Sequence, residues 1–436
     1  MLLLKEIILD AQTNNLFTGV LRELKVTSVD KKATIIIGVR RCGKTTLINQ
    51  IAANILSQGI SQKNFLYINF FDERLSFLKT EGLNKVLEAY FSIYPEKKNQ
   101  EKIYCFFDEI QIMPDWEKFI DRIQRTENCE VFITGSSANL LSKDIATEMR
   151  GRSLSWELFP FSFFEFLLAK DVSYDLPLNT KNRLIIMKFF DEFFEKGGFP
   201  EVVSVEEHIR VKIHQEYFNS ILFRDLIERY DIPHPRAISD LAHRLINNIG
   251  SLYTLNKLTS YLQSLGHKAP KKSIAQYLEW FQDAFFLFTV RMYDASLSKS
   301  NANPKKIYCI DHSFVKSISS GILVNSGHLL ENLIFSALRR KYIEIYYYKT
   351  KGGHEVDFLI QTHQQQKFLV QVSESLVKPQ TRQRELKALE VAMAELNLSS
   401  GIVITLNEHE QITVDMGVIN IIPAWKFLLE DLNLTR

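Results

Sequence analysis

Residues 38–45 read GVRRCGKT and match the pattern G-x-x-x-x-G-K-[ST] of a phosphate-binding loop. The residues before them, 33–37, form the apolar run ATIII, which predicts a buried parallel strand. Residues 46–56 follow with apolar side chains at helical spacing. A strand, a glycine loop and a helix in this order turn backbone N–H groups and a helix N-terminus toward an anion. This context favours a nucleotide site over a chance glycine loop.

The side chains of this loop have expected roles. Lys44 would reach the β- and γ-phosphates of bound ATP, and Thr45 would ligate Mg²⁺. We therefore expect ATP and Mg²⁺ as cofactors. The expected nucleotide-binding residues are Gly38, Arg40, Arg41, Cys42, Gly43, Lys44, Thr45 and Thr46.

A second apolar run, IYCFF at residues 103–107, ends in Asp108 and Glu109. A buried strand that ends in acids exposes them at the carboxyl edge of the sheet, where ligands bind in doubly wound folds. We expect Asp108 to hold Mg²⁺ through water and Glu109 to orient the attacking water. The alternative is a strand that ends in solvated acids, but its pairing with the phosphate-binding loop argues against this.

Two further strands are expected around the site. Residues 65–68 lie between the loop and the acidic strand, and we expect their strand to separate the strand of Lys44 from that of Asp108. Residues 131–134 lead toward Ser136, whose small hydroxyl side chain can contact the γ-phosphate or the water. Ser136 is therefore a candidate sensor of the nucleotide, although a plain Gly-Ser turn explains the pattern equally well.

The bulk properties limit the class of protein. A chain of 436 residues predicts roughly two to four domains. A net charge of +2 neither requires nor excludes nucleic acid, and the four cysteines form no C-x-x-C pair. The leading leucines are followed at once by Lys5 and Glu6, and the apolar stretch 158–169 is too short to cross a bilayer. We expect a soluble, cytoplasmic protein with no membrane partner.

Strand and helix patterns divide the chain into segments. Strand candidates alternate with helical patterns up to residue 160, as in a parallel sheet covered on both faces. Helical patterns and breaks rich in Gly and Pro follow, and strand patterns return from residue 305. We expect a P-loop ATPase domain at residues 1–160, a helical lid with connecting helices at 161–235, a winged-helix-like domain at 236–295 and a second α/β domain at 296–436.

The chain resembles the AAA+ ATPases of the archaeal-type or STAND-like branch at residues 38–46, 65–75, 105–116, 133–141 and 151–167. The sequences GGFPE at 197–201 and LFRD at 222–225 make it similar to one large prokaryotic family with an uncharacterised C-terminal region. The resemblance implies an α/β fold, with a P-loop AAA+ parallel sheet and a helical lid, and it implies an ATP hydrolase.

The resemblance also implies a role for an arginine that follows the sensor region. Arg152 would contact the γ-phosphate, in cis or across a subunit boundary, and would stabilise charge in the transition state. The alternative, for Arg152 and for Arg150, is a salt bridge with a neighbouring acid. Action across a boundary implies a homo-oligomer, and an unknown protein partner also stays open.

Residues 236–290 have the layout of a winged helix, with expected helices at 238–246, 254–262 and 271–281. Basic and polar residues open the third helix, as suits insertion into the major groove of double-stranded DNA. The local basic cluster consists of Lys257, His267, Lys268, Lys271 and Lys272. A plain helical subdomain with a solvated lysine face and a protein-contact module are equally open interpretations.

The last domain carries Glu331 in an expected helix, Asp357 in an expected strand, and Gln371 and Ser373 in the next strand. This arrangement resembles the restriction-endonuclease-like, or PD-(D/E)xK, fold, which gathers Mg²⁺ with a helix Glu, a strand Asp and an E-x-K motif. Gln371 and Ser373 stand in place of the acid and the lysine of that motif, and neither replaces them chemically. We expect a catalytically degenerate nuclease fold. The alternative is an α/β domain in which Asp357 is an ordinary strand-end acid.

These patterns predict a Mg²⁺-dependent ATP hydrolase that acts as a nucleotide-driven conformational switch on or near DNA. One alternative is an ATP-regulated adaptor that contacts a protein and binds no nucleic acid. A second alternative is an ATP-dependent nuclease, which Gln371 and Ser373 argue against.

Overall fold

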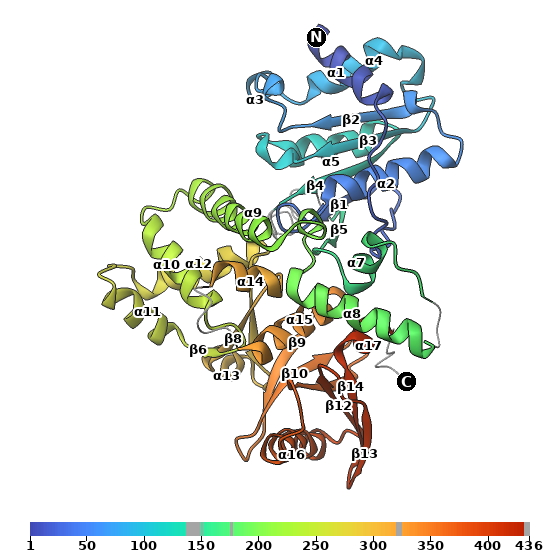
Figure 1. Cartoon of the computed structure of the whole chain (residues 1–436). Coiled ribbons are helices and arrows are strands. Elements are labelled where there is room, and N and C mark those ends of the chain that lie inside the picture. Colours follow the sequence, from blue (N-terminus) through green and yellow to red (C-terminus); the bar gives the residue numbers. More distant parts are fainter. Residues whose placement is uncertain (137–148, 150, 175–177, 320–324, 431–436) are drawn as a thin grey trace. The chain divides into compact units, whose positions relative to one another are not determined.

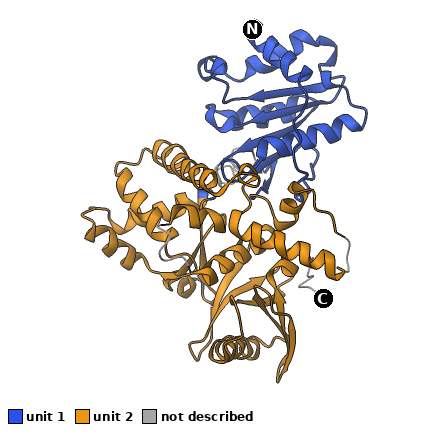
Figure 2. Ribbon diagram, in the orientation of Figure 1, with its two compact units in different colours: residues 1–159, 283–285 blue, residues 160–282, 286–436 orange. Residues whose placement is uncertain are grey.

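A computed structural model of the chain describes residues 1–136, 149, 151–174, 178–319 and 325–430. The chain divides into two compact units, Met1–Phe159 with Asp283–Phe285 and Pro160–Gln282 with Phe286–Arg436 (Figure 2). Among the described residues, no helix combines the length and the apolar character that crossing a bilayer requires.

The first unit is built on a parallel sheet of five strands (Figure 1). The strands are β1 (Ala33–Ile37), β2 (Phe65–Asn69), β3 (Ile103–Asp108), β4 (Cys129–Gly135) and β5 (Ser153–Glu157). Their order across the sheet is β2-β3-β4-β1-β5, and every neighbouring pair is parallel. The predicted parallel α/β sheet is confirmed. All five carboxyl ends therefore meet at one edge of the sheet.

One detail of the predicted strand order is wrong. The strand between β1 and β3 is β4, whereas β2 lies at the edge of the sheet. The order along the chain misled the prediction, because crossover connections let strands that are distant in sequence become neighbours. The ring of Phe106 on β3 stacks against Phe132 on β4 with centroids 5.0 Å apart, which fixes this pairing in the core.

Helices flank the sheet of the first unit. They are α1 (Leu2–Thr13), α2 (Lys44–Ser57), α3 (Leu78–Glu81), α4 (Asn84–Ile93) and α5 (Trp116–Thr126), with 3₁₀ turns at Gln62–Asn64, Glu73–Leu75, Pro95–Lys97 and Ile110–Ile112. α1 contacts β2 and α4, while α2 and α5 both contact β4. Apolar faces of these helices are buried against strands that are themselves buried, as parallel sheets require.

The second unit is built on a mixed sheet of nine strands. They are β6 (Leu252–Tyr253), β7 (Leu287–Met292), β8 (Lys305–Cys309), β9 (Ile345–Lys349), β10 (Glu355–Gln361), β11 (Lys367–Val372), β12 (Ser400–Thr405), β13 (Glu410–Val414) and β14 (Gly417–Pro423). Their order is β13-β14-β12-β11-β10-β9-β7-β8-β6. β7 pairs in parallel with β9. One sheet therefore contains strands from both of the domains that we expected at residues 236–295 and 296–436.

The helices of the second unit are α7 (Phe163–Ala169), α8 (Thr180–Lys196), α9 (Glu207–Ser220), α10 (Pro235–Ile246), α11 (Leu255–Ser264), α12 (Lys271–Asp283), α13 (Leu297–Ala302), α14 (His312–Ile318), α15 (Ser326–Lys341), α16 (Pro379–Leu396) and α17 (Ala424–Leu429). A 3₁₀ turn lies at Pro200–Val202, and α9 continues directly into a π-helix at Ile221–Glu228. The hydrogen-bond spacing of this helix therefore changes at Ile221, directly before the LFRD sequence.

The GGFPE sequence forms a fixed turn within the second unit. The Gly198 N–H donates a hydrogen bond of 2.7 Å to Oδ2 of Asp311, and the Gly198 carbonyl accepts one of 2.5 Å from the Phe161 N–H. A Cβ atom on Gly198 would lie 2.3 Å from the Phe161 carbonyl oxygen, so no other residue fits this position. The motif thus has a structural explanation, because it joins the segment after Pro160 to the segment after β8.

Candidate functional site

The loop 38–43 connects β1 to α2 at the carboxyl edge of the first sheet. Two glycines are required by its geometry. A Cβ atom on Gly38 would lie 2.1 Å from the Leu158 carbonyl oxygen, and Gly43 has a φ of 99°, in the region that glycine favours. α2 begins at Lys44, so its first N–H groups turn toward the loop. The strand, loop and helix predicted from the sequence are present at the predicted residues.

The ammonium group of Lys44 is buried inside the curve of this loop. Its Nζ donates hydrogen bonds of 3.1 Å to the Gly38 carbonyl and 3.2 Å to the Val39 carbonyl. It also lies 3.8 Å from Oε1 of Glu109. Because carbonyl oxygens carry no formal charge, this cation keeps most of its capacity to attract phosphate.

The predicted Mg²⁺ ligands Thr45 and Asp108 lie side by side. The Thr45 hydroxyl donates a 2.8 Å hydrogen bond to Oδ2 of the buried Asp108 carboxylate. Thr134 donates to the other oxygen, and the Tyr67 hydroxyl donates to Oδ2 at 3.3 Å. Burial, reinforced by the Asp108 charge, raises the pKa of Tyr67, so its hydroxyl stays protonated and donates. Hydroxyl and carboxylate oxygens are the ligands that Mg²⁺ prefers, so these residues fit that ion.

Glu109 is held in an unusual backbone conformation beside this pair. Its φ of 57° is left-handed, which is uncommon for a residue other than glycine and occurs preferentially at functional sites. Its N–H donates to the Thr134 hydroxyl at 3.0 Å, and its Oε2 accepts a 2.5 Å hydrogen bond from the Gln111 amide. These contacts fix a carboxylate close to Lys44 and the phosphate-binding loop.

Ser136 and Arg152 are the two other predicted site residues. They lie at opposite ends of the parallel strands, Ser136 at the carboxyl ends and Arg152 at the amino ends. Ser136 follows β4, so it lies at the carboxyl edge with the loop, and it is buried. Arg152 precedes β5, and its guanidinium pairs with Asp121 on α5. The register pairs Glu157 with Ile37, so Arg152 lies five residues, or about 16 Å, before the edge that carries its own loop. The salt bridge expected as the alternative is therefore present, whereas Arg150 lies outside the described residues.

Sequence reasoning missed three polar residues that support the site. Thr134 and Tyr67 bind Asp108, and Arg22 donates hydrogen bonds of 2.8 Å to the Cys42 carbonyl and 2.6 Å to the Phe159 carbonyl. Thr134 had a detectable signal, since it is the polar end of an apolar strand. Arg22 had none, because it lies in an irregular segment far from the loop in sequence.

Burial raises the pKa of the Cys42 thiol in the phosphate-binding loop, so this thiol stays neutral.

Comparison with known proteins agrees with this geometry. A family profile described as "AAA domain" matches residues 30–167, which supports a P-loop ATPase domain that binds ATP. Two domains of unknown function, DUF8612 and DUF4143, match residues 187–322 and 326–427. The uncharacterized protein MJ1544 of Methanocaldococcus jannaschii is 36% identical over 419 residues, which cover 94% of this chain and 90% of that protein. The chain belongs to the MJ1544 family.

Another similar protein comes from a bacterium. An uncharacterized protein of Haemophilus influenzae is 31% identical over 330 residues, covering 74% of this chain and 78% of that protein. Among solved structures, the Walker-type ATPase PABY2304 of Pyrococcus abyssi aligns over 66% of this chain and 90% of that chain, with 14% identity and a TM-score of 0.42. That TM-score is too low to support an inference. The relatives place the MJ1544 family in both archaea and bacteria without naming an activity.

The second unit of this MJ1544-family chain holds a buried acid cluster. Glu331 on α15 and Asp357 on β10 lie close together, and Lys306 on β8 lies between them, 2.9 Å and 2.8 Å from their respective oxygens. Gln371 accepts a hydrogen bond from the Asp357 N–H at 3.2 Å, and the Ser373 hydroxyl donates to the Ser375 carbonyl at 3.2 Å. In the described part of the chain, no three or more His, Cys, Asp or Glu side chains are arranged to hold a metal ion.

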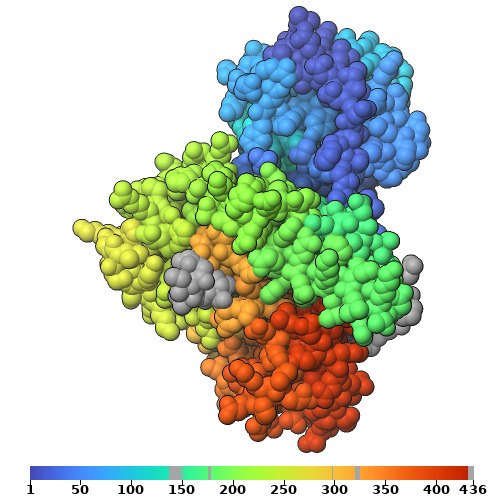
Figure 3. Space-filling model, viewed as in Figure 1, coloured from blue at the N-terminus to red at the C-terminus, as the bar shows by residue number. Residues whose placement is uncertain are grey.

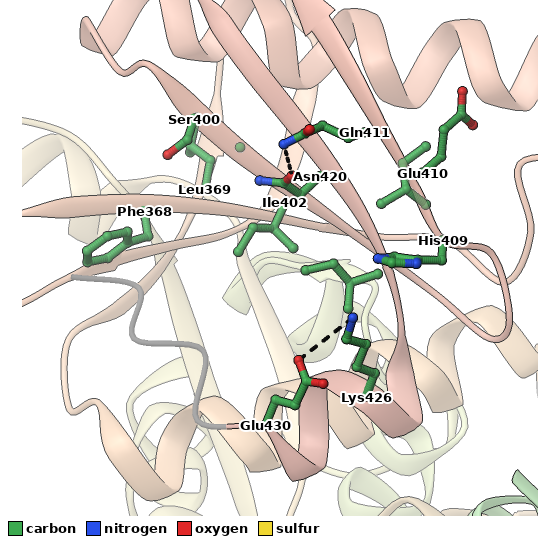
Figure 4. Close-up of a pocket in the computed structure, with 13 residues that line it drawn as sticks. Phe368, Leu369, Ser400, Ile402, His409, Glu410, Gln411, Asn420, Lys426 and Glu430 are labelled. Carbon is green, nitrogen blue, oxygen red and sulfur yellow. Dashed lines mark hydrogen bonds and ion pairs between the residues drawn. The ribbon is translucent and has the colours of Figure 1, made fainter. Parts of the chain in front are cut away.

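Two cavities that are lined by described residues of the second unit contain polar side chains. The larger, of about 1170 Å³, is lined by Glu331, Asp357, Gln371 and Ser373 among others. The smaller, of about 680 Å³, lies over β11 to β14 and α17 (Figure 4). The dashed lines of Figure 4 mark two contacts among its lining residues: a hydrogen bond from Gln411 to Asn420, of 3.0 Å, and an ion pair of Lys426 with Glu430, of 3.9 Å. Of these two cavities, the larger contains the residues that the sequence suggested for a degenerate nuclease site.

If this site hydrolyses ATP, as proposed below, we expect Thr134→Val to slow that reaction by about 10- to 100-fold while ATP binding changes little. The substitution preserves shape but removes a donor to Asp108 and an acceptor for the Glu109 N–H, and a hydrogen bond to a charged group contributes about 1.5–3 kcal/mol. Phosphate release and nucleotide affinity would be measured in parallel. Thr126→Val is the matched control, since this exposed hydroxyl bonds only within and beside α5. An unchanged hydrolysis rate in Thr134→Val would show that Thr134 is not needed to position Asp108 and Glu109.

Proposed function

We propose that this protein is a Mg²⁺-dependent ATP hydrolase that works as a nucleotide-driven conformational switch. The observation that carries the proposal is the meeting of Lys44, Thr45, Asp108 and Glu109 at one sheet edge. An ammonium group, a pair of Mg²⁺ ligands and a carboxylate are the parts that P-loop hydrolases use. The match to the AAA domain supports the same class.

In this proposal each group has one task. Lys44 binds the β- and γ-phosphates, and Thr45 with Asp108 would hold Mg²⁺, which neutralises phosphate charge when bound. Glu109 accepts a hydrogen bond from the attacking water, and the amide of Gln111 holds that carboxylate in place. Ser136 is a proposed contact of the γ-phosphate. The proposed nucleotide contacts also include Gly38, Arg40, Arg41, Cys42, Gly43 and Thr46.

Two substitutions separate binding from hydrolysis. Lys44→Ala should weaken ATP binding by at least about 100-fold, because it removes a buried cation that meets phosphate. Glu109→Gln should keep ATP affinity within a few-fold and slow hydrolysis by about 10²–10⁴-fold, since an amide cannot accept the proton of the water. Equilibrium nucleotide binding and phosphate release measure the two effects. Lys79→Ala, an exposed lysine of α3, is the control. Undiminished hydrolysis in Glu109→Gln would refute the role given to that carboxylate.

We further propose that Arg152 contacts the γ-phosphate of a neighbouring subunit. Its distance from its own loop supports action in trans, and one third of its side chain is exposed (34%). Arg152→Ala should lose hydrolysis, and mixing it with Lys44→Ala should restore activity, because each protein supplies what the other lacks. Asp121→Asn, which keeps the arginine, should stay active. A wild-type rate in Arg152→Ala at every protein concentration would exclude this contact.

A second function, binding of double-stranded DNA, is favoured by the layout of α10 to β8. Three helices and three strands follow in the order α10-β6-α11-α12-β7-β8, and β8 lies between β6 and β7, as in a winged helix. α12 begins with the exposed Lys271 and Lys272, and α10 to α12 (yellow-green to yellow) form an outer lobe of the second unit (Figure 3). His267 pairs with Asp240 at 2.6 Å and so contributes less to the basic cluster.

We expect duplex DNA to bind in a salt-dependent way and to remain uncut. Lys271→Glu with Lys272→Glu should weaken binding and reduce the slope of log K against log salt by about 2, whereas Lys181→Glu with Lys188→Glu on α8 should change it little. Filter binding across a salt series gives the slope, and gels with Mg²⁺ or Mn²⁺ report cleavage. Absence of salt-dependent binding would favour the ATP-regulated protein adaptor. Cleavage that Asp357→Ala removes would contradict the proposed degenerate site of Glu331, Asp357, Gln371 and Ser373.

A further inference from the structure

We infer that the ammonium group of Lys306 takes the place of a metal ion in the acid cluster of the second unit. Its Nζ lies 2.8 Å from Oδ1 of Asp357 and 2.9 Å from Oε1 of both Glu331 and Glu355. The ammonium group donates hydrogen bonds to Glu331 and Asp357, and the Glu355 carboxylate completes the set as an ion pair. The inference deepens the proposed degenerate site and does not depend on ATP hydrolysis.

The residues present do not fit a divalent cation. The side chain of Lys306 is 3% exposed, so its charge stays within the cluster, and a second cation a few ångströms away would be strongly repelled. Two of the acids also accept further hydrogen bonds. Oδ2 of Asp357 accepts the Val372 N–H at 2.9 Å, and Oε1 of Glu331 accepts the Tyr308 hydroxyl at 2.6 Å.

Gln371, which stands at the acid position of the E-x-K motif, is also unavailable to a metal ion. The Gln371 amide donates to Oε2 of Glu385 at 2.7 Å, while its carbonyl accepts the Asp357 N–H. Both ends of this side chain are therefore committed to neighbours. The absent E-x-K carboxylate has been replaced by a group that bridges two strands and α16.

The negative charges of the clustered carboxylates explain why a permanent cation, Lys306, is needed at this place. Burial raises the pKa of Glu331 to about 7, and the nearby Asp357 charge adds to the rise. Burial opposes the charge on Lys306, but the carboxylates more than offset it, so the pKa of Lys306 is raised and the ammonium persists. Without it, the buried carboxylates of Glu331 and Asp357 would lie together beside the half-buried Glu355, a costly arrangement unless some are protonated or another cation enters.

Lys306 could alternatively be a catalytic lysine that has moved to another strand of an active nuclease. Such a lysine acts beside a bound metal ion, whereas this one occupies the centre of the acids. The two ideas differ in what happens when Lys306 is removed. Replacement of an internal cation should create a metal site, while loss of a catalytic lysine should abolish cleavage.

The test uses the full chain, without nucleotide, and measures Mn²⁺ binding by titration for the wild type, Lys306→Met and Lys305→Met. Lys305 is the matched control, because it precedes Lys306 on β8 and adjacent side chains of a strand point to opposite faces. Lys306→Met should bind one Mn²⁺ more per chain than the other two proteins. Its Tm should rise by about 5 °C when Mn²⁺ is in ~100-fold excess over its Kd. Adding Asp357→Asn should remove both effects.

Several results would overturn the inference. One is that the wild type binds Mn²⁺ and that Asp357→Asn abolishes this binding. A second is that Lys306→Met folds but binds no extra ion. A third is that the wild type cleaves DNA and that Lys306→Met removes this cleavage. If Lys306→Met does not fold in the absence of metal, Mn²⁺ or a second change, Glu331→Gln, should restore folding by rebalancing the charge. Failure of both to do so would also count against it. None of these readouts requires ATP, so they fail or succeed separately from the hydrolase proposal.

Discussion

The hydrogen bond between Thr45 and Asp108 brings the two halves of the nucleotide site together. One residue opens α2 and the other ends β3, and the two strands involved are not neighbours, because β4 lies between β1 and β3. The contact is possible because all five strands run parallel, so their carboxyl ends meet at one edge. The intervening strand also supplies Thr134, which binds both Asp108 and the Glu109 backbone. The site therefore depends on the strand order as much as on the motifs.

Two buried lysines show how the groups around a cation decide whether its charge is available to a ligand. Lys44 donates to two uncharged carbonyls and lies 3.8 Å from Glu109, so an incoming phosphate gains most of the attraction of its charge. Lys306 contacts three carboxylates at 2.8–2.9 Å. Coulomb energy falls with distance, so the second cation is largely compensated within the protein. The first arrangement is suited to a ligand, and the second to the stability of the sheet.

The sequence predicted the parts of the fold that depend on local pattern. The bounds of β1 are those expected, and the loop, α2 and Asp108 are where the motifs placed them. The strand order could not be predicted, because it depends on crossovers rather than on local pattern. The two-residue strand β6 was missed for a related reason, since its hydrogen bonds come from β8, which is distant in sequence. β13 and β14 pair as a local hairpin and were missed although their partners are close in sequence. Lys306 carried no signal, because a lysine at the start of an apolar run usually lies in solvent.

One segment of the second unit links the turn of the family motif to the acid cluster. β8 carries Lys306 into the cluster, and Asp311, two residues beyond its end, accepts the Gly198 N–H. The other oxygen of Asp311 accepts the N–H groups of Ser313 and Phe314 at the start of α14. Moving the turn without β8 would break a buried hydrogen bond to a charged group, at a cost of about 1.5–3 kcal/mol. The turn and the nine-stranded sheet are therefore coupled by specific contacts, and a displacement of one is resisted by the other.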